Sequence, residues 1–171
     1  MFRDGGAGTE RNVANLDADN PQLPVLPPVL PAAAIVAAIV LDWLPLHFLA
    51  PPVGFNLQVI VGVVLTALGI WLGASASRLF QREGTNVIPT QPTTRIVTSG
   101  PYRFTRNPMY LGMVLVVLGI SLIFSLEWGV ILTPVLWLAL DRLIVVREEA
   151  YLRRKFGASY EALLTRTRRW I

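Results

Sequence analysis

The chain passes from a polar, cationic turn into a long apolar stretch at Thr98-Ser99-Gly100-Pro101-Tyr102-Arg103-Phe104-Thr105-Arg106-Asn107-Pro108-Met109-Tyr110-Leu111-Gly112. Asn107 followed by Pro108 is typical of a helix start, with asparagine as the cap and proline at the first helical position. The free backbone N–H groups of such a start favour an anion. Two arginines and two tyrosines lie within about two turns of it. This segment therefore predicts a small-molecule site at a membrane surface.

The composition indicates that lipid is the main solvent of this chain. Of its 171 residues 53% are hydrophobic and only 15% charged, and the mean hydropathy is +0.53, as expected for an integral membrane protein. Cysteine is absent and His47 is the only histidine, which excludes disulfides, thiolate nucleophiles and metal centres built from Cys or clustered His. No metal site is expected. Any chemistry must use Arg, Glu, Asp, Tyr, backbone dipoles and a bound cofactor.

Four apolar segments predict an all-α, polytopic membrane bundle of about four transmembrane helices followed by a C-terminal cytoplasmic helix. Each segment is close to the ~20 residues that a helix needs to cross the hydrocarbon. They lie at about residues 28–46, 57–76, 109–126 and 128–146. Residues 1–25, rich in Gly, Asp, Asn and Pro, are expected to form a flexible extension, which leaves 26–171 as the folded domain.

The positive charges are divided into blocks by the apolar segments. No Lys or Arg lies between Arg11 and Arg78, or between Arg106 and Arg142. This pattern predicts that the loop at 77–108, the C-terminal tail and both termini are cytoplasmic. It also favours membrane lipids over nucleic acid as the partner of the basic residues.

Glycines recur at helical spacing in two of the apolar segments. Gly62, Gly69 and Gly73 lie in the second, and Gly112 and Gly119 in the third. Small residues at such spacing let helix backbones approach closely. Packing inside the bundle is the favoured interpretation over homodimerisation.

Ionisable residues follow the fourth apolar segment at a depth where they are costly unless paired or facing a polar cavity. On a continuous helix Arg142 and Glu149 are seven residues apart, so they share a face and lie roughly 10 Å apart along the axis. That face can hold a cation and an anion toward one pocket. The alternative is that Asp141 and Arg142 mark the membrane interface and that Glu148, Glu149, Arg153 and Arg154 belong to a solvated amphipathic helix.

The residues of the opening segment have their own alternatives. Arg103 and Arg106 suit membrane-surface anchors for anionic headgroups, and Tyr102 and Tyr110 suit interfacial aromatics. Taken together with the helix start, they favour an anion-binding, aromatic-lined cytoplasmic cavity.

The C-terminal half of the chain, roughly residues 85–171, resembles the superfamily of isoprenylcysteine carboxyl methyltransferases and phospholipid methyltransferases, which are integral membrane enzymes. The resemblance rests on an ordered set of short motifs. These are Gly100-Pro101-Tyr102, Arg106-Asn107-Pro108-Met109-Tyr110, Glu148-Glu149, Phe156-Gly157 with Tyr160, and Arg169-Trp170-Ile171. Asn107 stands where better-known members commonly have histidine.

The resemblance implies that S-adenosylmethionine binds on the cytoplasmic side without a Rossmann domain. The acceptor would reach the methyl group from the bilayer and would be a prenylcysteine-like carboxylate, a lipid or another hydrophobic small molecule. Carried over by position, the cofactor pocket would be formed by Tyr102, Arg106, Asn107, Pro108, Tyr110, Glu148 and Glu149.

The chemistry of this cofactor agrees with the residues present. Arg106 at a helix start suits its carboxylate, and Glu148 or Glu149 suits its ammonium and ribose hydroxyls. Aromatic faces suit the sulfonium. Arg142 and Glu149 are the candidate catalytic residues, with Arg142 expected to hold an anionic acceptor headgroup.

Two other functions remain open at this point. One is a sterol-reductase-like membrane enzyme that uses NADPH, and the other is a non-catalytic, lipid-binding scaffold. Cofactor binding distinguishes all three, because only a methyltransferase is expected to bind S-adenosylhomocysteine and only a reductase NADPH.

Overall fold

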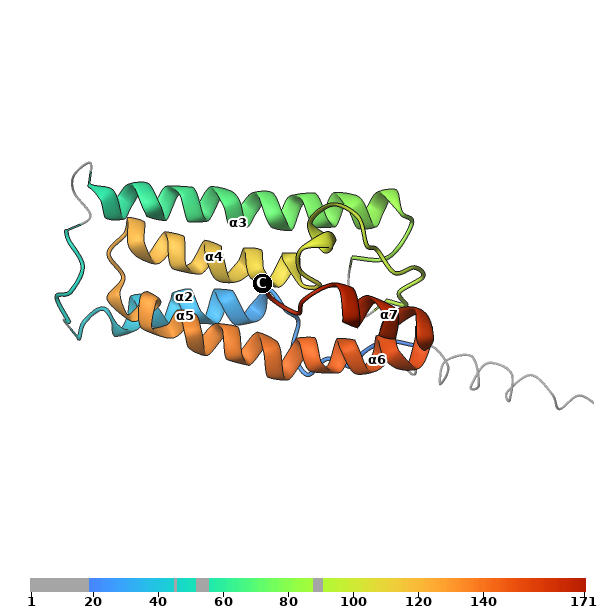
Figure 1. The fold of residues 1–171 in the computed structure, drawn as a ribbon. Helices are drawn as coiled ribbons and strands as arrows, with labels where there is room; N and C mark the ends of the chain where they lie inside the picture. The colour runs from blue at the N-terminus through green and yellow to red at the C-terminus, as the bar shows by residue number, and fades with distance from the viewer. Residues whose placement is uncertain (1–18, 45, 52–55, 88–90) are drawn as a thin grey trace, which may run out of the picture.

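A computed structural model describes residues 19–44, 46–51, 56–87 and 91–171. Within these ranges the chain is helical, which confirms the predicted all-α class. Long helices run side by side along one axis (Figure 1). They are α2 (Val29–Leu41), α3 (Leu57–Arg82), α4 (Pro108–Ile123) and α5 (Glu127–Ala139), which continues through a π-helical turn η2 (Leu140–Val145) into α6 (Val146–Phe156). A 3₁₀ turn η1 (Gly100–Arg103) precedes α4, and α7 (Ala158–Arg166) follows α6.

Helices form at all four apolar segments, but their lengths differ from those expected. Leu57–Arg82, with 26 residues, and the continuous rod Glu127–Phe156, with 30, are long and apolar enough to cross a membrane. With 13 and 16 residues, α2 and α4 reach only about 20 and 24 Å at 1.5 Å per residue. A hydrocarbon core is about 30 Å thick. Two of the four expected spans therefore have the required length.

The two long rods, Leu57–Arg82 and Glu127–Phe156, extend beyond their apolar parts. No residue that ends a helix stands where the apolar part of either rod stops. The second apolar segment was expected to stop near residue 76, yet α3 continues to Arg82 and ends before Gly84, which adopts a positive φ of 66°. The fourth continues past 146 to Phe156 and ends at Gly157, whose φ is 51°. Glycine allows these left-handed conformations. The polar ends of both rods therefore project beyond the apolar bundle.

Glycines bring α3 and α4 into close contact. A Cβ atom added to Gly69 would lie 2.5 Å from the carbonyl oxygen of Gly112, and one added to Gly62 would lie 2.8 Å from that of Gly119. Gly73 differs, because a Cβ there would meet nothing within 4 Å. Glycines at this spacing thus pack α3 against α4 within one chain, in agreement with the interpretation favoured from the sequence.

A single carboxylate fixes the α2–α3 connection to the start of α5. Glu127 accepts four backbone N–H groups, with N···O distances of 3.0, 2.6, 2.6 and 3.0 Å from Leu46, His47, Phe48 and Leu49. The indole of Trp128 donates to the carbonyl of Leu44 at 2.9 Å. The bonds to Glu127 satisfy backbone N–H groups of residues 46–49, which are not in a helix.

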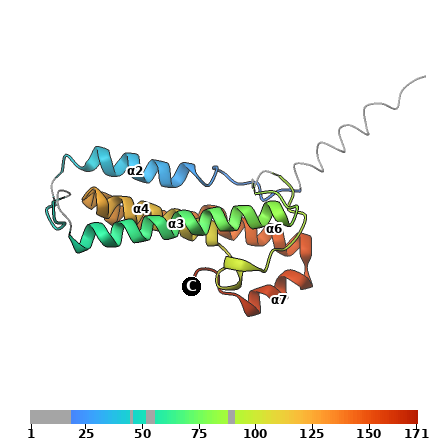
Figure 2. The same cartoon turned by 90° about the horizontal axis from the view of Figure 1, so that it is seen from above.

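The other end of the bundle carries η1, α6 and α7 (Figures 1 and 2). Part of the expected N-terminal extension also lies here. Residues 1–18 are outside the described ranges, but Leu23 and Val25 pack against the core cluster around Leu140 and Ile144, and Asp19 bonds to Lys155 at 2.5 Å. Partly buried apolar residues that follow Asp19 therefore pack against the bundle.

The glycine contacts generate a stability prediction with an internal control. Gly69→Ala should lower the thermal unfolding midpoint in detergent, because the methyl group overlaps the α4 backbone and such overpacking costs about 1–3 kcal/mol. Gly73→Ala should leave the midpoint unchanged or raise it, since alanine is the better helix former. Equal midpoints for the two variants would contradict the packing described here.

Candidate functional site

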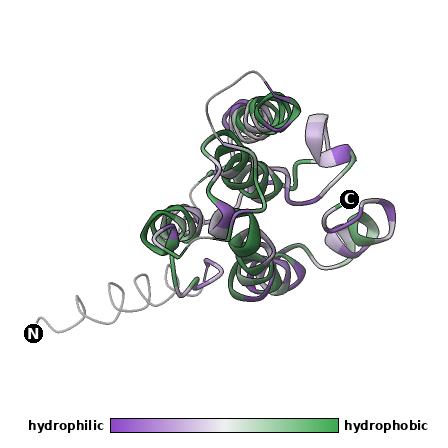
Figure 3. Cartoon of the chain, turned by 90° about the vertical axis from the view of Figure 1, so that its left-hand side faces the viewer, coloured by the Kyte–Doolittle hydropathy of each residue, from purple (hydrophilic) through white to green (hydrophobic). Residues whose placement is uncertain are grey.

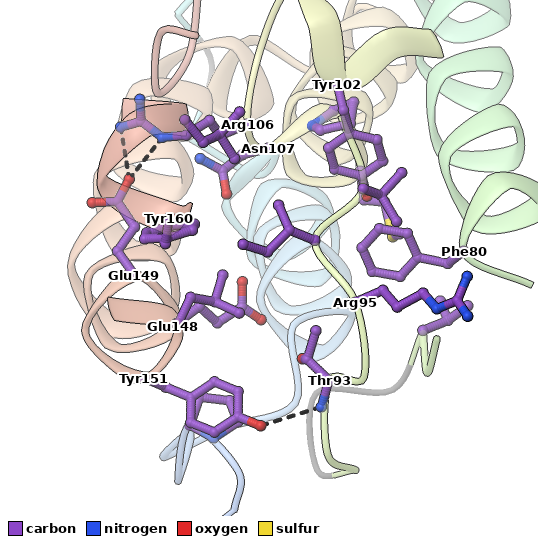
Figure 4. A pocket seen from close by; sticks show the side chains of 18 of the residues that line it. Phe80, Thr93, Arg95, Tyr102, Arg106, Asn107, Glu148, Glu149, Tyr151 and Tyr160 are labelled. Atoms are coloured by element: carbon purple, nitrogen blue, oxygen red, sulfur yellow. Dashed lines mark hydrogen bonds and ion pairs between the residues drawn. The ribbon is translucent and has the colours of Figure 1, made fainter. Parts of the chain in front are cut away.

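A cavity lies at the polar end of the bundle, where α4 begins. Its walls come from the end of α3, the segment before α4, and helices α6 and α7 (Figure 4). It has a volume of about 120 Å³ and opens to the surface. All the residues expected to bind the cofactor line it, namely Tyr102, Arg106, Asn107, Pro108, Tyr110, Glu148 and Glu149.

The carboxylate of Glu149 forms the centre of a buried ion-pair network. Its Oε1 lies 2.9 Å from Nη2 of Arg106, and its Oε2 lies 2.6 Å from Nη2 of Arg169. The Glu149 side chain is 7% exposed and that of Arg106 12%. The hydrogen bonds that Arg169 donates to the Glu149 carboxylate raise the pKa of Arg169 above its usual value. Two guanidinium groups on one carboxylate satisfy its acceptor capacity, as burial of that charge requires.

The same arginines attach the C-terminal segment to the site. Arg169 also contacts Asp141 at 3.3 Å, and the indole of Trp170 donates to the Asp141 carboxylate at 2.8 Å. Arg106 donates through its backbone N–H to the carbonyl of Arg168 at 3.0 Å and through its guanidinium to that of Thr167. The last residues of the chain therefore form one wall behind the cavity.

Asn107 has a different role from the one expected. It precedes α4, and its backbone carbonyl accepts the N–H of Leu111 at 2.9 Å, but its side chain makes no capping hydrogen bond. Its Nδ2 instead donates to the carbonyl of Arg169 at 2.9 Å. The expected side-chain cap is thus wrong, because the neighbouring C-terminal segment offers the amide a carbonyl acceptor.

Glu148 is the carboxylate that faces the cavity. Its Oε1 accepts a hydrogen bond from the hydroxyl of Tyr110 at 2.6 Å, and its side chain points into the open space between α6 and the segment before α4 (Figure 4). A carboxyl group has acceptor lone pairs for more than one hydrogen bond, whether it is ionised or protonated. Unlike Glu149, Glu148 forms no ion pair within the described parts of the chain, so it retains acceptor capacity toward the cavity.

Aromatic residues form much of the remaining lining. Phe80, near the end of α3, stacks on Tyr102 with ring centroids 5.2 Å apart and planes at 15°. Burial raises the pKa of Tyr102 well above its usual value. Burial, assisted by the charge of Glu149, raises the pKa of Tyr160 to about 12. Both phenols therefore remain neutral at physiological pH and offer apolar faces to a ligand.

Arg142 is the one expected site residue that the structure does not bring to the cavity. Its side chain is 77% exposed, and its nearest carboxylate is Asp141 at 3.7 Å. The shared face expected for Arg142 and Glu149 required a continuous α-helix, but residues 140–145 form a π turn. A π turn places about one extra residue in a helical turn, so residues seven apart no longer point the same way. That geometric expectation is wrong.

Several lining residues were not predicted. Phe80, Thr93 and Arg95 belong to the segments before the motif, and Pro21 lies far from it in sequence. The phenol of Tyr151 accepts the backbone N–H of Thr93 at 3.2 Å. Of these residues, only Tyr151 carried a usable signal, because it lies three residues after Glu148 and so shares a helix face with it.

The Glu149 network generates a prediction about stability. Glu149→Gln should lower the thermal unfolding midpoint strongly, by the equivalent of about 3 kcal/mol, because it leaves two arginines without their shared carboxylate. The matched control is Glu161→Gln, which removes an exposed pair with Arg153 at 3.3 Å and should cost less than about 1 kcal/mol. Differential scanning fluorimetry of both variants measures the difference, and similar shifts would contradict the network's importance.

Comparisons with known proteins support one of the three functions considered above. A model of the phospholipid methyltransferase family matches residues 57–159, which include α3, the segment before α4 and the Glu148-Glu149 pair. No curated protein and no solved structure matches the chain. The match covers more than half of the 171 residues and favours a methyltransferase over a reductase or a scaffold. The chain belongs to the phospholipid methyltransferase family.

Proposed function

We propose that the protein transfers a methyl group from S-adenosylmethionine to a lipophilic acceptor at the cytoplasmic membrane face. The observation that carries this proposal is the convergence of the motif residues, from Tyr102 to Glu149, on one cavity. Most residues that line the cavity lie within the region that matches the methyltransferase family, and Pro21, Tyr160 and Leu163 lie outside it. The cavity also lies at the end of the bundle where long apolar helices become polar, so it is within reach of both a soluble cofactor and a lipid.

The residues of the cavity suit the groups of the cofactor. Glu148 can accept hydrogen bonds from its ammonium or ribose hydroxyls. The stacked rings of Phe80 and Tyr102 offer faces to the adenine or the sulfonium. Arg95, exposed at the cavity and without an ion pair in the described ranges, can bind its carboxylate.

Arg106 and Glu149 are better suited to positioning than to direct contact. Each is engaged with the other, and Arg106 also donates to the carbonyl of Thr167. Their pairing holds α6 against the segment before α4, which fixes the distance between Glu148 and Tyr102 across the cavity. Arg142 lies outside the cavity, so its place in the proposal is limited to a headgroup arriving along the bilayer.

The reaction needs alignment and exclusion of water more than acid–base chemistry. S-adenosylmethionine supplies a methyl group on a positively charged sulfur, and the acceptor's electron pair forms the new bond as the carbon–sulfur bond breaks and its pair returns to sulfur. Buried aromatic walls around Tyr102 and Tyr160 exclude water, and fixed walls favour a near-attack geometry. A carboxylate acceptor needs no general base.

Incubation of the purified protein with methyl-labelled cofactor and a total lipid extract tests the proposal. We expect label in a lipid-soluble product, identified by mass spectrometry. Absence of labelled product together with binding of NADPH would support a reductase instead, and binding of neither cofactor would support a scaffold.

Glu148→Gln should weaken binding of S-adenosylhomocysteine by about 10- to 100-fold, the range expected when a hydrogen bond to a charged group loses its charge. Isothermal titration calorimetry in detergent measures this effect. Glu161→Gln, on the exposed face of α7, serves as the control and should bind as the wild type does. Unchanged affinity of the Glu148 variant would refute its assignment as a cofactor ligand.

A further inference from the structure

A second hollow lies between η1 and α7, separate from the cavity described above. It has a volume of about 480 Å³. Thr98 and Arg103 line it from the side of η1, and Ser159, Ala162 and Arg166 line it from α7. Both elements project to one side of the helix bundle (Figures 2 and 3). The walls of the hollow therefore lie on that side of the bundle.

The two arginines of this hollow differ from those of the first cavity. Among the described residues, neither Arg103 nor Arg166 forms an ion pair, whereas the nearby Arg106 and Arg169 both pair with Glu149. No carboxylate from the described part of the chain lines the hollow, and Thr98 and Ser159 add hydroxyl donors. Guanidinium groups match the oxygens of a phosphate in geometry and charge. The lining thus selects an anion with several acceptor oxygens.

An apolar residue next to the hollow indicates where that anion would come from. Phe104 directly follows Arg103 and is 79% exposed. Arg78 and Arg82 mark the same level on α3, where its apolar part ends. Large exposed apolar side chains next to cations are typical of the membrane interface, where aromatic and basic residues meet lipid headgroups.

We propose that this hollow binds the phosphate group of a membrane phospholipid through Arg103 and Arg166. The site is independent of methyl transfer and of the cofactor cavity. The two nevertheless share a wall, because Leu163 lines both hollows and Thr167, which lines the second, accepts a hydrogen bond from Arg106 of the first. A bound phospholipid would therefore lie directly behind the cavity wall.

Native mass spectrometry of the full chain, released from detergent, tests the proposal with phosphatidylglycerol as the probe. The wild type should retain phosphatidylglycerol but not diacylglycerol, which lacks the phosphate. Arg103→Gln and Arg166→Gln should each weaken retention about fivefold, the effect of one cation at an anionic surface. Arg154→Gln removes an exposed arginine of α6 that does not line the hollow, and it should bind as the wild type does.

A steric variant separates this site from a general effect of charge. Ala162→Trp fills the hollow without changing the net charge and should abolish retention, while thermal unfolding midpoints confirm that each variant is folded. Wild-type retention in the arginine variants, or an equal loss in Arg154→Gln, would overturn the proposal. Inorganic phosphate that competes as strongly as the lipid would overturn the phospholipid as occupant. None of these measurements depends on the cofactor. They can therefore support the phospholipid site even if the proposed methyl transfer is wrong.

Discussion

The site depends on one buried carboxylate, Glu149, held between two arginines from different parts of the chain. Arg106 comes from the segment before α4 and Arg169 from the C-terminus. A buried charge is costly unless it is paired and fully hydrogen-bonded, so each segment must be in place for the others to be stable. This requirement joins α6, the start of α4 and the last residues of the chain into one unit. Glu148, the preceding residue on the same helix, is thereby aimed into the cavity.

The bilayer explains why such a network is found at this end of the bundle. Helices with apolar exteriors, such as α3, cannot supply a polar site within the hydrocarbon without great cost. Both long rods therefore continue past their apolar parts, and the polar ends come together with η1 and α7. The π turn at residues 140–145 contributes to this arrangement. It rotates α6 relative to α5, so that Arg142 is exposed while Glu149 is buried.

The sequence predicted those features that depend on short separations or on periodicity. Apolar segments of suitable length located the four helices, and the motif around Arg106 and the Glu148-Glu149 pair located the residues of the cavity. Phe80 and Pro21 were not predicted, because their places depend on how distant segments pack. The π turn was also not predicted, since nothing in the apolar pattern distinguishes it from an α-helix. That turn is why the helical spacing of Arg142 and Glu149 gave the wrong geometry.

The hydrogen bonds of Asn107 show what a side chain at this position must do. The amide donates to the carbonyl of Arg169 and the backbone N–H bonds to the hydroxyl of Thr105 at 3.1 Å, so the residue ties the start of α4 to the C-terminal segment. An imidazole N–H can donate in the same way, which gives a physical reason why asparagine can stand where similar proteins commonly have histidine. Because an amide cannot exchange a proton near neutral pH, the side chain here acts through geometry. This would suit the proposed methyl transfer, a displacement in which positioning contributes more than proton transfer.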